Sequence, residues 1–106
     1  MIIYGLSTCD TCRKARKALP KFEFCDVRAD GMPSEVLDAA LKTFGAALVN
    51  TRSTTWRGLD EDTRRKPAIQ LIKTYPALMK RPLIAVDKLL FLGWNSDIEA
   101  KVKAAV

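Results

Sequence analysis

The sequence predicts an α/β fold that runs strand–helix–strand, helical insertion, strand–strand–helix. Three observations carry this prediction. Short runs of β-branched and aromatic residues, closed by Gly, Asp or Pro, indicate strands near both ends of the chain. From about 34 to 79, apolar residues recur at helical spacing instead. Two cysteines separate the first strand from the first helix, and 106 residues fit one domain, 1–106, with a real core.

The chain begins with a predicted strand and helix that flank the cysteine pair. Met1–Leu6 is an apolar, β-branched run, which is typical of a buried strand. The basic segment that follows contains strong helix formers, and Pro20 ends it. Cys9 and Cys12 lie in the turn between the two elements. Cys9 is therefore expected at or just before the helix N-terminus.

This position favours a reactive thiolate at Cys9. The first N–H groups of a helix have no intrahelical partners and carry partial positive charge. Arg13, Lys14 and Arg16 add fixed positive charge nearby. Together these groups lower the pKa of a thiol, and the thiolate is the nucleophile. Cys12, one helical turn further on, is placed to resolve a mixed disulfide on Cys9.

Two other interpretations of the cysteine pair stay open. A structural zinc site takes four ligands, whereas the chain has three cysteines and no histidine. A pair of buried, unreactive thiols is the second alternative, but it leaves the basic helix unexplained. Cys25 falls in the next predicted strand, where a small buried apolar role is the simplest interpretation. The absence of histidine excludes Ser-His-Asp and Cys-His nucleophile pairs.

A second strand and a long helix follow the cysteine segment. Lys21–Val27 alternates apolar and polar residues, which indicates a strand. With the first strand and helix it makes a βαβ unit whose strands should be parallel. After a loop at 28–33, Ser34 is expected to cap a helix that Gly45 ends.

The rest of the chain is expected to form a polar loop, short helices, a hairpin and a last helix. Residues 50–58 are rich in hydroxyls and contain two arginines and a tryptophan, which predicts a loop. The other expected elements are short helices from 60 and from 68, a hairpin of 83–87 with 89–92, and a last helix capped by Asn95 or Ser96.

The composition indicates a globular protein with an anionic partner. Eighteen basic residues face 12 acidic ones, so the net charge is +6. This excess fits an oxyanion, an anionic thiol such as glutathione, or nucleic acid. No nucleic-acid motif accompanies the charge, so we rank that partner last. Without an 18-residue apolar run or a signal-peptide pattern, we expect a cytoplasmic monomer that does not use a membrane.

The element order with a CxxC after the first strand is the thioredoxin-type arrangement. Pro82 begins the third predicted strand, and two interpretations apply to it. Base rates favour a trans peptide bond at a first strand residue. The thioredoxin-type arrangement favours a cis-proline that faces the cysteine turn.

Three separated motifs resemble the arsenate reductase family of glutaredoxin relatives. They are Cys9–Ala15, Asn50–Arg57 and Lys80–Ile84, and they occur in the right order over nearly the whole chain. The match is closest to the small branch of glutathione-dependent thiol reductase-like (YffB-type) proteins. The resemblance implies a thioredoxin-like, glutaredoxin-like fold with Pro82 in cis and Cys9 as the nucleophile.

The resemblance also implies an anion site beside Cys9. Arginines that match Arg52 and Arg81 hold an oxyanion or the carboxylate of a bound thiol in that family. Guanidinium groups suit such anions because they donate two parallel hydrogen bonds. The alternative for Arg81 is a salt bridge at the boundary of the helical insertion, and Arg52 has a similar structural alternative. Thr8 and Thr11 are weaker candidates for hydrogen-bond donors to the thiolate.

Two departures from the family bear on function. Arsenate reductases of this kind carry a third arginine shortly after the last strand, where Phe91–Asn95 contains none, and they usually lack a second cysteine at the CxxC spacing. We therefore expect a thiol–disulfide oxidoreductase that acts on a small disulfide or oxyanion. It would use no metal or bound cofactor, with reduced glutathione as co-substrate or a glutaredoxin- or thioredoxin-type reductant. The alternatives are arsenate reduction and a redox-sensing regulator that binds RNA polymerase, as in a branch that resembles this family and keeps a CxxC.

Overall fold

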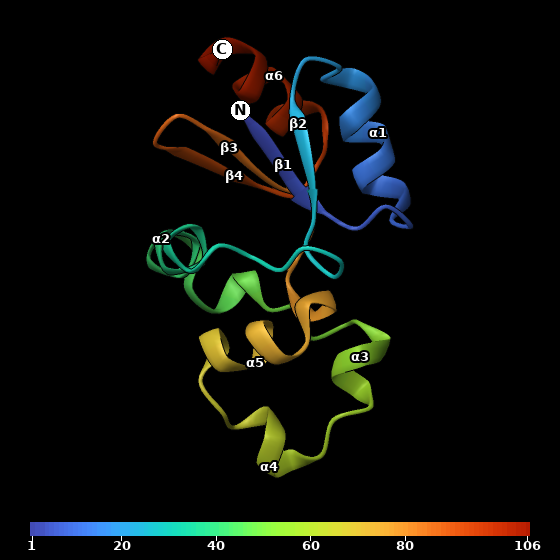
Figure 1. Ribbon diagram of the computed structural model, residues 1–106, viewed down its shortest axis with the longest axis vertical. Coiled ribbons are helices and arrows are strands. Elements are labelled where there is room, and N and C mark those ends of the chain that lie inside the picture. Colours follow the sequence, from blue (N-terminus) through green and yellow to red (C-terminus); the bar gives the residue numbers. More distant parts are fainter. The chain divides into compact units, whose positions relative to one another are not determined.

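The computed structural model describes all 106 residues and has the predicted α/β class (Figure 1). The chain divides into two compact units, one of residues 1–30 with 81–106 and one of residues 31–80. The first unit contains the whole sheet, and the second consists of helices joined by one isolated β-bridge. That 1–106 forms a single domain stays a prediction.

The sheet of the first unit has four strands in the order β2-β1-β3-β4. β1 runs parallel to β2, which confirms the predicted βαβ unit, and antiparallel to β3. A two-residue turn joins β3 to β4, and Asp87 adopts a positive φ of 52° in it. The strands are β1 (Ile2–Gly5), β2 (Glu23–Asp26), β3 (Leu83–Val86) and β4 (Leu89–Leu92).

Two helices of the first unit, α1 (Asp10–Ala18) and α6 (Ser96–Ala105), share a core with the sheet. Its buried members are Ile3, Ala15, Leu19, Ile84, Val86 and Val102. Each large aliphatic side chain buried this way contributes about 1.5–3 kcal/mol. This packing fixes α1 on the sheet and so fixes the residues at its N-terminus.

Residues 31–80 form a separate set of short helices. Their elements are α2 (Ser34–Phe44), η1 (Gly45–Leu48), α3 (Thr54–Arg57), α4 (Glu61–Arg64), α5 (Ala68–Thr74) and η2 (Pro76–Leu78). The bridge between Val49 and Met79 closes the set. On either side of it, the N–H of Asn50 donates to the Leu78 carbonyl (2.8 Å) and the N–H of Lys80 to the Leu48 carbonyl (2.7 Å).

The structure corrects three local predictions. The expected loop 50–58 contains the short helix α3, because the Ser53 hydroxyl accepts from the Trp56 N–H (3.1 Å) and caps it. Ser34 does not cap α2: it is the first helical residue, and Pro33 precedes it with no side-chain cap. Cys25 is half-buried, not buried, because β2 is an edge strand.

The last helix follows the prediction, since Asn95 caps α6 by accepting from the Ile98 N–H (2.8 Å). None of the helices combines the length and apolar character that crossing a membrane requires.

Candidate active site

Cys9 is the N-cap residue of α1, where the sequence places it. Its backbone is extended (φ −83°, ψ 122°), and its carbonyl accepts the first helical hydrogen bond, from the Arg13 N–H (3.0 Å). Its own N–H donates to the Leu6 carbonyl (3.1 Å), so the turn after β1 is closed on both sides of the cysteine. The sulfur therefore lies beside the unpaired N–H groups of the first helical turn.

Strand pairing brings Arg81 and Pro82 to this turn from the far end of the sequence. β3 pairs antiparallel with β1, so that Leu83 lies opposite Tyr4. The residues just before β3 thus reach the turn that follows β1. The Arg81 side chain hydrogen-bonds to the sulfur of Cys9. The Arg81–Pro82 peptide bond is cis, as the resemblance implies, and Pro82 is buried.

The pKa of Cys9 lies below its ordinary value, for causes that all lie in the first unit. Partial burial opposes ionisation, but the other groups outweigh it. The backbone N–H and the thiol of Cys12 stabilise the Cys9 thiolate, and Arg81 adds a hydrogen bond and a positive charge. Cys9 is therefore the more acidic thiol of the pair.

Cys12 has the opposite character. It is fully buried, and burial together with the hydrogen bond and negative charge of Cys9 raises its pKa to about 12. Its sulfur packs against Gly5: a Cβ added to that glycine would lie 2.5 Å from it. Neutral Cys12 can thus donate to the Cys9 thiolate while it stays out of reach of bulky reagents.

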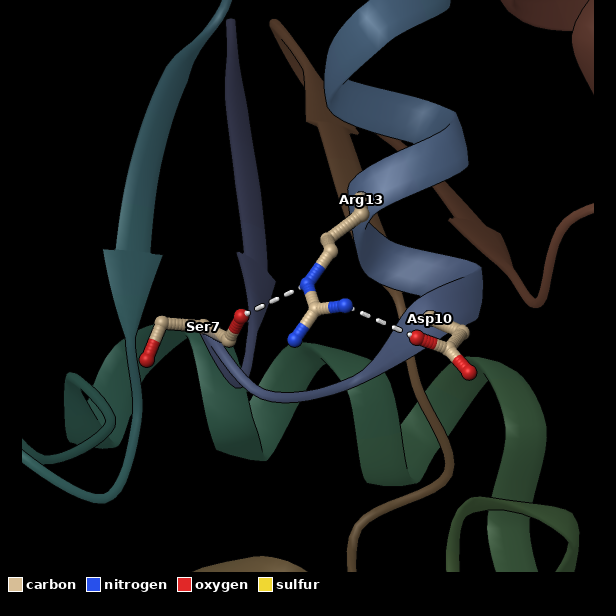
Figure 2. Close-up of polar contacts among 3 residues, drawn as sticks. All are labelled: Ser7, Asp10 and Arg13. Carbon is tan, nitrogen blue, oxygen red and sulfur yellow. Dashed lines mark hydrogen bonds and ion pairs between the residues drawn. The ribbon is translucent and has the colours of Figure 1, made fainter.

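Arg13 braces the loop that carries Cys9 (Figure 2). Its Nε donates to the Ser7 carbonyl at 3.3 Å, and a terminal nitrogen lies 3.0 Å from the Asp10 carboxylate. These two partners stand on either side of the Thr8–Cys9 segment. The guanidinium therefore ties the loop to the first turn of α1. The sequence marked Arg13 only as a source of positive charge.

A carboxylate at the end of β2 holds the same loop from the other side. One oxygen of Asp26 accepts from the Ser7 N–H (3.1 Å), and the other accepts from the N–H groups of Arg28 (2.9 Å) and Ala29 (3.2 Å). The hydrogen bonds, that from Ser7 first, lower the pKa of Asp26. An Asp before a loop is a local turn signal, but the bond to Ser7 depends on the β1–β2 pairing.

Comparison with known proteins shows to which family the chain belongs. The ArsC family model matches residues 4–102. The chain belongs to the ArsC family. A Haemophilus influenzae protein described as uncharacterized is 38% identical over 102 residues, which cover 88% of this chain and 90% of the relative.

Solved structures agree with this assignment and with the YffB-type branch. A YffB protein is 29% identical, covers 99% of this chain with 98% of its own, and superposes with a TM-score of 0.85. An arsenate reductase (ArsC) related protein from Brucella melitensis is 35% identical, and the match covers 97% of this chain and 91% of that protein, with a TM-score of 0.69.

A further relative by sequence is the Enterococcus faecalis global transcriptional regulator Spx. It is 27% identical, and the match covers 92% of this chain and 81% of Spx. The thioredoxin-like fold is confirmed, and membership of the ArsC family supports a thiol oxidoreductase.

The other predicted site residues of this ArsC-family chain, Thr8, Thr11 and Arg52, are not among the groups that lower the pKa of Cys9. Thr8 is exposed and Thr11 is half-buried, whereas the groups that lower the pKa of Cys9 are Cys12 and Arg81. Arg52 belongs to the second unit, where its side chain is exposed at a hollow of about 420 Å³. The roles of both threonines and of Arg52 stay predictions.

Arg64 has a positioning role that the sequence did not reveal. Its guanidinium donates to the Trp56 carbonyl at 3.2 and 3.1 Å and to the Arg57 carbonyl at 3.2 Å. It also lies 5.5 Å from the centroid of the Trp56 ring. Arg64 thus ties α4 to α3. The only sequence signal for this role was the run of basic residues at the end of α4. That run is equally well explained by the favourable interaction of positive charge with a helix C-terminus.

The cysteines form neither a disulfide nor a metal cluster. All three carry thiols in this structure. No three Cys, Asp or Glu side chains come together in a group that could hold a metal ion.

Proposed function

We propose that this protein is a glutathione-dependent thiol–disulfide oxidoreductase with Cys9 as its nucleophile. The observation that carries the proposal is the difference in acidity between the two thiols of the CxxC. The pKa of Cys9 is lowered, and that of Cys12 is raised to about 12. A thiolate is the nucleophile in disulfide exchange, and a lowered pKa increases its population at neutral pH. The ArsC family and the arsenate reductase-related neighbour support the same chemistry.

The reaction has three steps. The Cys9 thiolate attacks one sulfur of a small disulfide, which forms a mixed disulfide and expels the other sulfur as a thiolate. The thiol of Cys12, after losing its proton, or a glutathione thiolate then attacks the Cys9 sulfur and releases the substrate thiol. If glutathione attacks, it leaves a Cys9–glutathione disulfide, and a second glutathione thiolate attacks the glutathione sulfur of this bond, frees the Cys9 thiolate and leaves as glutathione disulfide. If Cys12 resolves, two glutathione molecules reduce the Cys9–Cys12 disulfide and leave as glutathione disulfide. No bound cofactor or metal takes part.

Arg81 would do two things in this reaction. Its charge stabilises the attacking thiolate, and its guanidinium would hold the carboxylate of glutathione or an oxyanion beside Cys9. We assign Arg52 the second anion contact, and Thr8 and Thr11 the hydrogen bonds to the sulfur. Pro82, which follows Arg81 directly, would border the bound disulfide.

The experiment is a coupled turnover assay on wild type, Cys9→Ser and Cys12→Ser. A glutathione mixed disulfide is offered together with glutathione, its reductase and NADPH. We expect Cys9→Ser to lose turnover by at least about three orders of magnitude, as for loss of other nucleophiles. Cys12→Ser should keep activity if glutathione resolves the intermediate, and lose it if Cys12 does. Full activity in Cys9→Ser would contradict the proposal.

The same assay with arsenate tests the close alternative. Phe91–Asn95 contains no arginine where arsenate reductases of this family carry their third. Two arginines hold a tetrahedral oxyanion less firmly than three, so arsenate should be the poorer substrate. Faster turnover with arsenate than with the disulfide would make this protein an arsenate reductase.

Similarity to the global transcriptional regulator Spx supports a second candidate. We propose as this alternative a redox-gated regulator that binds RNA polymerase. In that case oxidation of Cys9 and Cys12 to a disulfide would change a binding surface without turnover. Binding to purified polymerase with and without dithiothreitol distinguishes the two functions. A redox-dependent complex in a chain with no turnover on either substrate would favour the regulator.

A further inference from the structure

A hollow of about 440 Å³ opens between α1 and β2, and the proposed thiol chemistry does not use it. We call it the α1–β2 groove. The residues that line it include Arg13, Arg16, Lys17, Leu19, Phe22 and Phe24, and no carboxylate is among them. The groove therefore has a cationic wall and an apolar floor.

The cationic wall is one stripe of α1. Arg13, Arg16 and Lys17 are spaced i, i+3 and i+4, so they share a face of the helix, and all three are exposed. Arg16 lies over the Phe24 ring, 4.1 Å from its centroid. This stacking holds the Arg16 guanidinium at the groove, where it can pair with an anion.

The other side of the groove is an open sheet edge. β2 is the last strand of the order β2-β1-β3-β4. The N–H groups of Glu23 and Val27 donate to β1 or the residue before it, at the Met1 carbonyl (3.1 Å) and the Gly5 carbonyl (2.9 Å). Because successive residues of a strand alternate, the N–H and C=O of Phe24 point away from β1. An open edge of this kind accepts another strand.

We infer that the α1–β2 groove binds an extended acidic segment of a partner protein. The backbone of the segment adds to β2 at Phe24, and its carboxylates face Arg16 and Lys17. Apolar side chains of the segment cover Leu19 and Phe22. The open strand edge matches a peptide backbone better than a nucleic acid, and Arg16 already covers the Phe24 ring on which a base would stack.

The groove adjoins the reactive loop without being part of it. Arg13 lines the groove and also bonds Ser7 and Asp10, which flank the Cys9 loop. A partner seated there would lie one helical turn from Cys9. Binding in the groove does not depend on the proposed function, since it uses neither cysteine.

The test measures binding of a fluorescent peptide in which Glu-Glu and Val-Val pairs alternate, so that each face of the extended chain carries both residue types. Fluorescence anisotropy is recorded at low and physiological salt, because charge pairing weakens as salt is added. The double variant R16E/K17E should bind the peptide at least about tenfold more weakly than wild type. The matched control K73E/K101E changes the net charge equally at two exposed lysines elsewhere and should bind as wild type does.

Amide exchange tests the strand addition directly. On saturation with the peptide, the Phe24 N–H should exchange at least about tenfold more slowly, as expected for a new strand hydrogen bond. If Arg16→Glu destabilises the fold, the exposed Lys17→Glu alone keeps the charge test valid.

Three results would overturn the inference. The first is equal loss of binding in R16E/K17E and K73E/K101E, and the second is equal affinity for a peptide with Lys in place of Glu. The third is unchanged exchange at Phe24. Tighter binding of a single-stranded DNA decamer than of the acidic peptide, lost in R16E/K17E, would assign the groove to nucleic acid instead.

Discussion

Different kinds of contact stabilise the inside of each of the two compact units. In residues 1–30 with 81–106, strands distant in the sequence pair side by side, and the site depends on that pairing: Arg81 reaches Cys9 because β3 lies beside β1. In residues 31–80, the described side-chain contacts are local caps and braces, such as Ser53 at α3 and Arg64 between α3 and α4. The thiol chemistry therefore rests on long-range strand pairing. In the helical unit the side-chain hydrogen bonds are short-range, and the Val49–Met79 bridge supplies a long-range backbone contact. The predictions below test that division.

Among the variants that test this division, the largest effect is expected for Arg81→Gln. Loss of the positive charge and its hydrogen bond should raise the pKa of Cys9, so the rising limb of the rate against pH should move to higher pH. Loss of one charged donor at a reacting centre costs on the order of a hundredfold in rate. The measurement is the pH dependence of both turnover and Cys9 alkylation.

The control for this variant is Lys88→Gln, which removes a charge from the exposed β3–β4 turn. Its pH profile should match that of wild type. A profile for Arg81→Gln that also matches wild type would show that helix position and Cys12 alone set the acidity of Cys9.

Gly5→Ala should come next and should act through Cys12. The added Cβ would lie 2.5 Å from the Cys12 sulfur, closer than a Cβ atom approaches another heavy atom, so the strand or the helix must shift. Overpacking of a buried site costs about 1–3 kcal/mol of unfolding free energy. Urea denaturation measures it. The double variant Gly5→Ala with Cys12→Ala should recover most of the loss, and no recovery would place the strain elsewhere.

Arg64→Ala tests the helical unit. Three donated hydrogen bonds to the Trp56 and Arg57 carbonyls disappear, together with the stacking on Trp56. Arg64 is half-buried, so water can replace some of the lost hydrogen bonds. We therefore expect the free energy of unfolding to fall by about 1–2 kcal/mol. The pKa of Cys9 should not change, since Cys12 and Arg81 set it. A changed Cys9 titration would show that the two units are not independent.

The smallest effect is expected for Ser53→Ala, which removes the cap of α3. The Ser53 hydroxyl accepts from the Trp56 N–H and donates to the Asn50 carbonyl (2.8 Å). Loss of such a cap costs about 1 kcal/mol. Ser34→Ala is the matched control, because Ser34 is exposed at the start of α2 and caps nothing. An equal loss in the two variants would mean that the α3 cap is not what stabilises this segment.

Local signals predicted much of the fold. The βαβ unit, the hairpin at 83–92 and the position of Cys9 at a helix start follow from residue alternation, turn residues and spacing. The same signals failed at 50–58 and at Ser34. At these two places the start of a helix depends on which hydroxyl side chain accepts a hydrogen bond from a backbone N–H of the first turn. A polar stretch contains several hydroxyl side chains that could cap a helix, so the sequence does not show which one does.

The sequence by itself determined the order of the elements, the CxxC at the start of a helix and the excess of positive charge, because periodicity, caps and composition act over a few residues. Only the tertiary structure decided which groups meet at the sulfur. The pairing of β1 with β3 brings Arg81 to Cys9, and the packing of α1 on β1 buries Cys12 against Gly5. Burial and a charged neighbour are properties of three-dimensional contact, so they, and not the CxxC spacing, separate the two thiols into an acidic one and a neutral one.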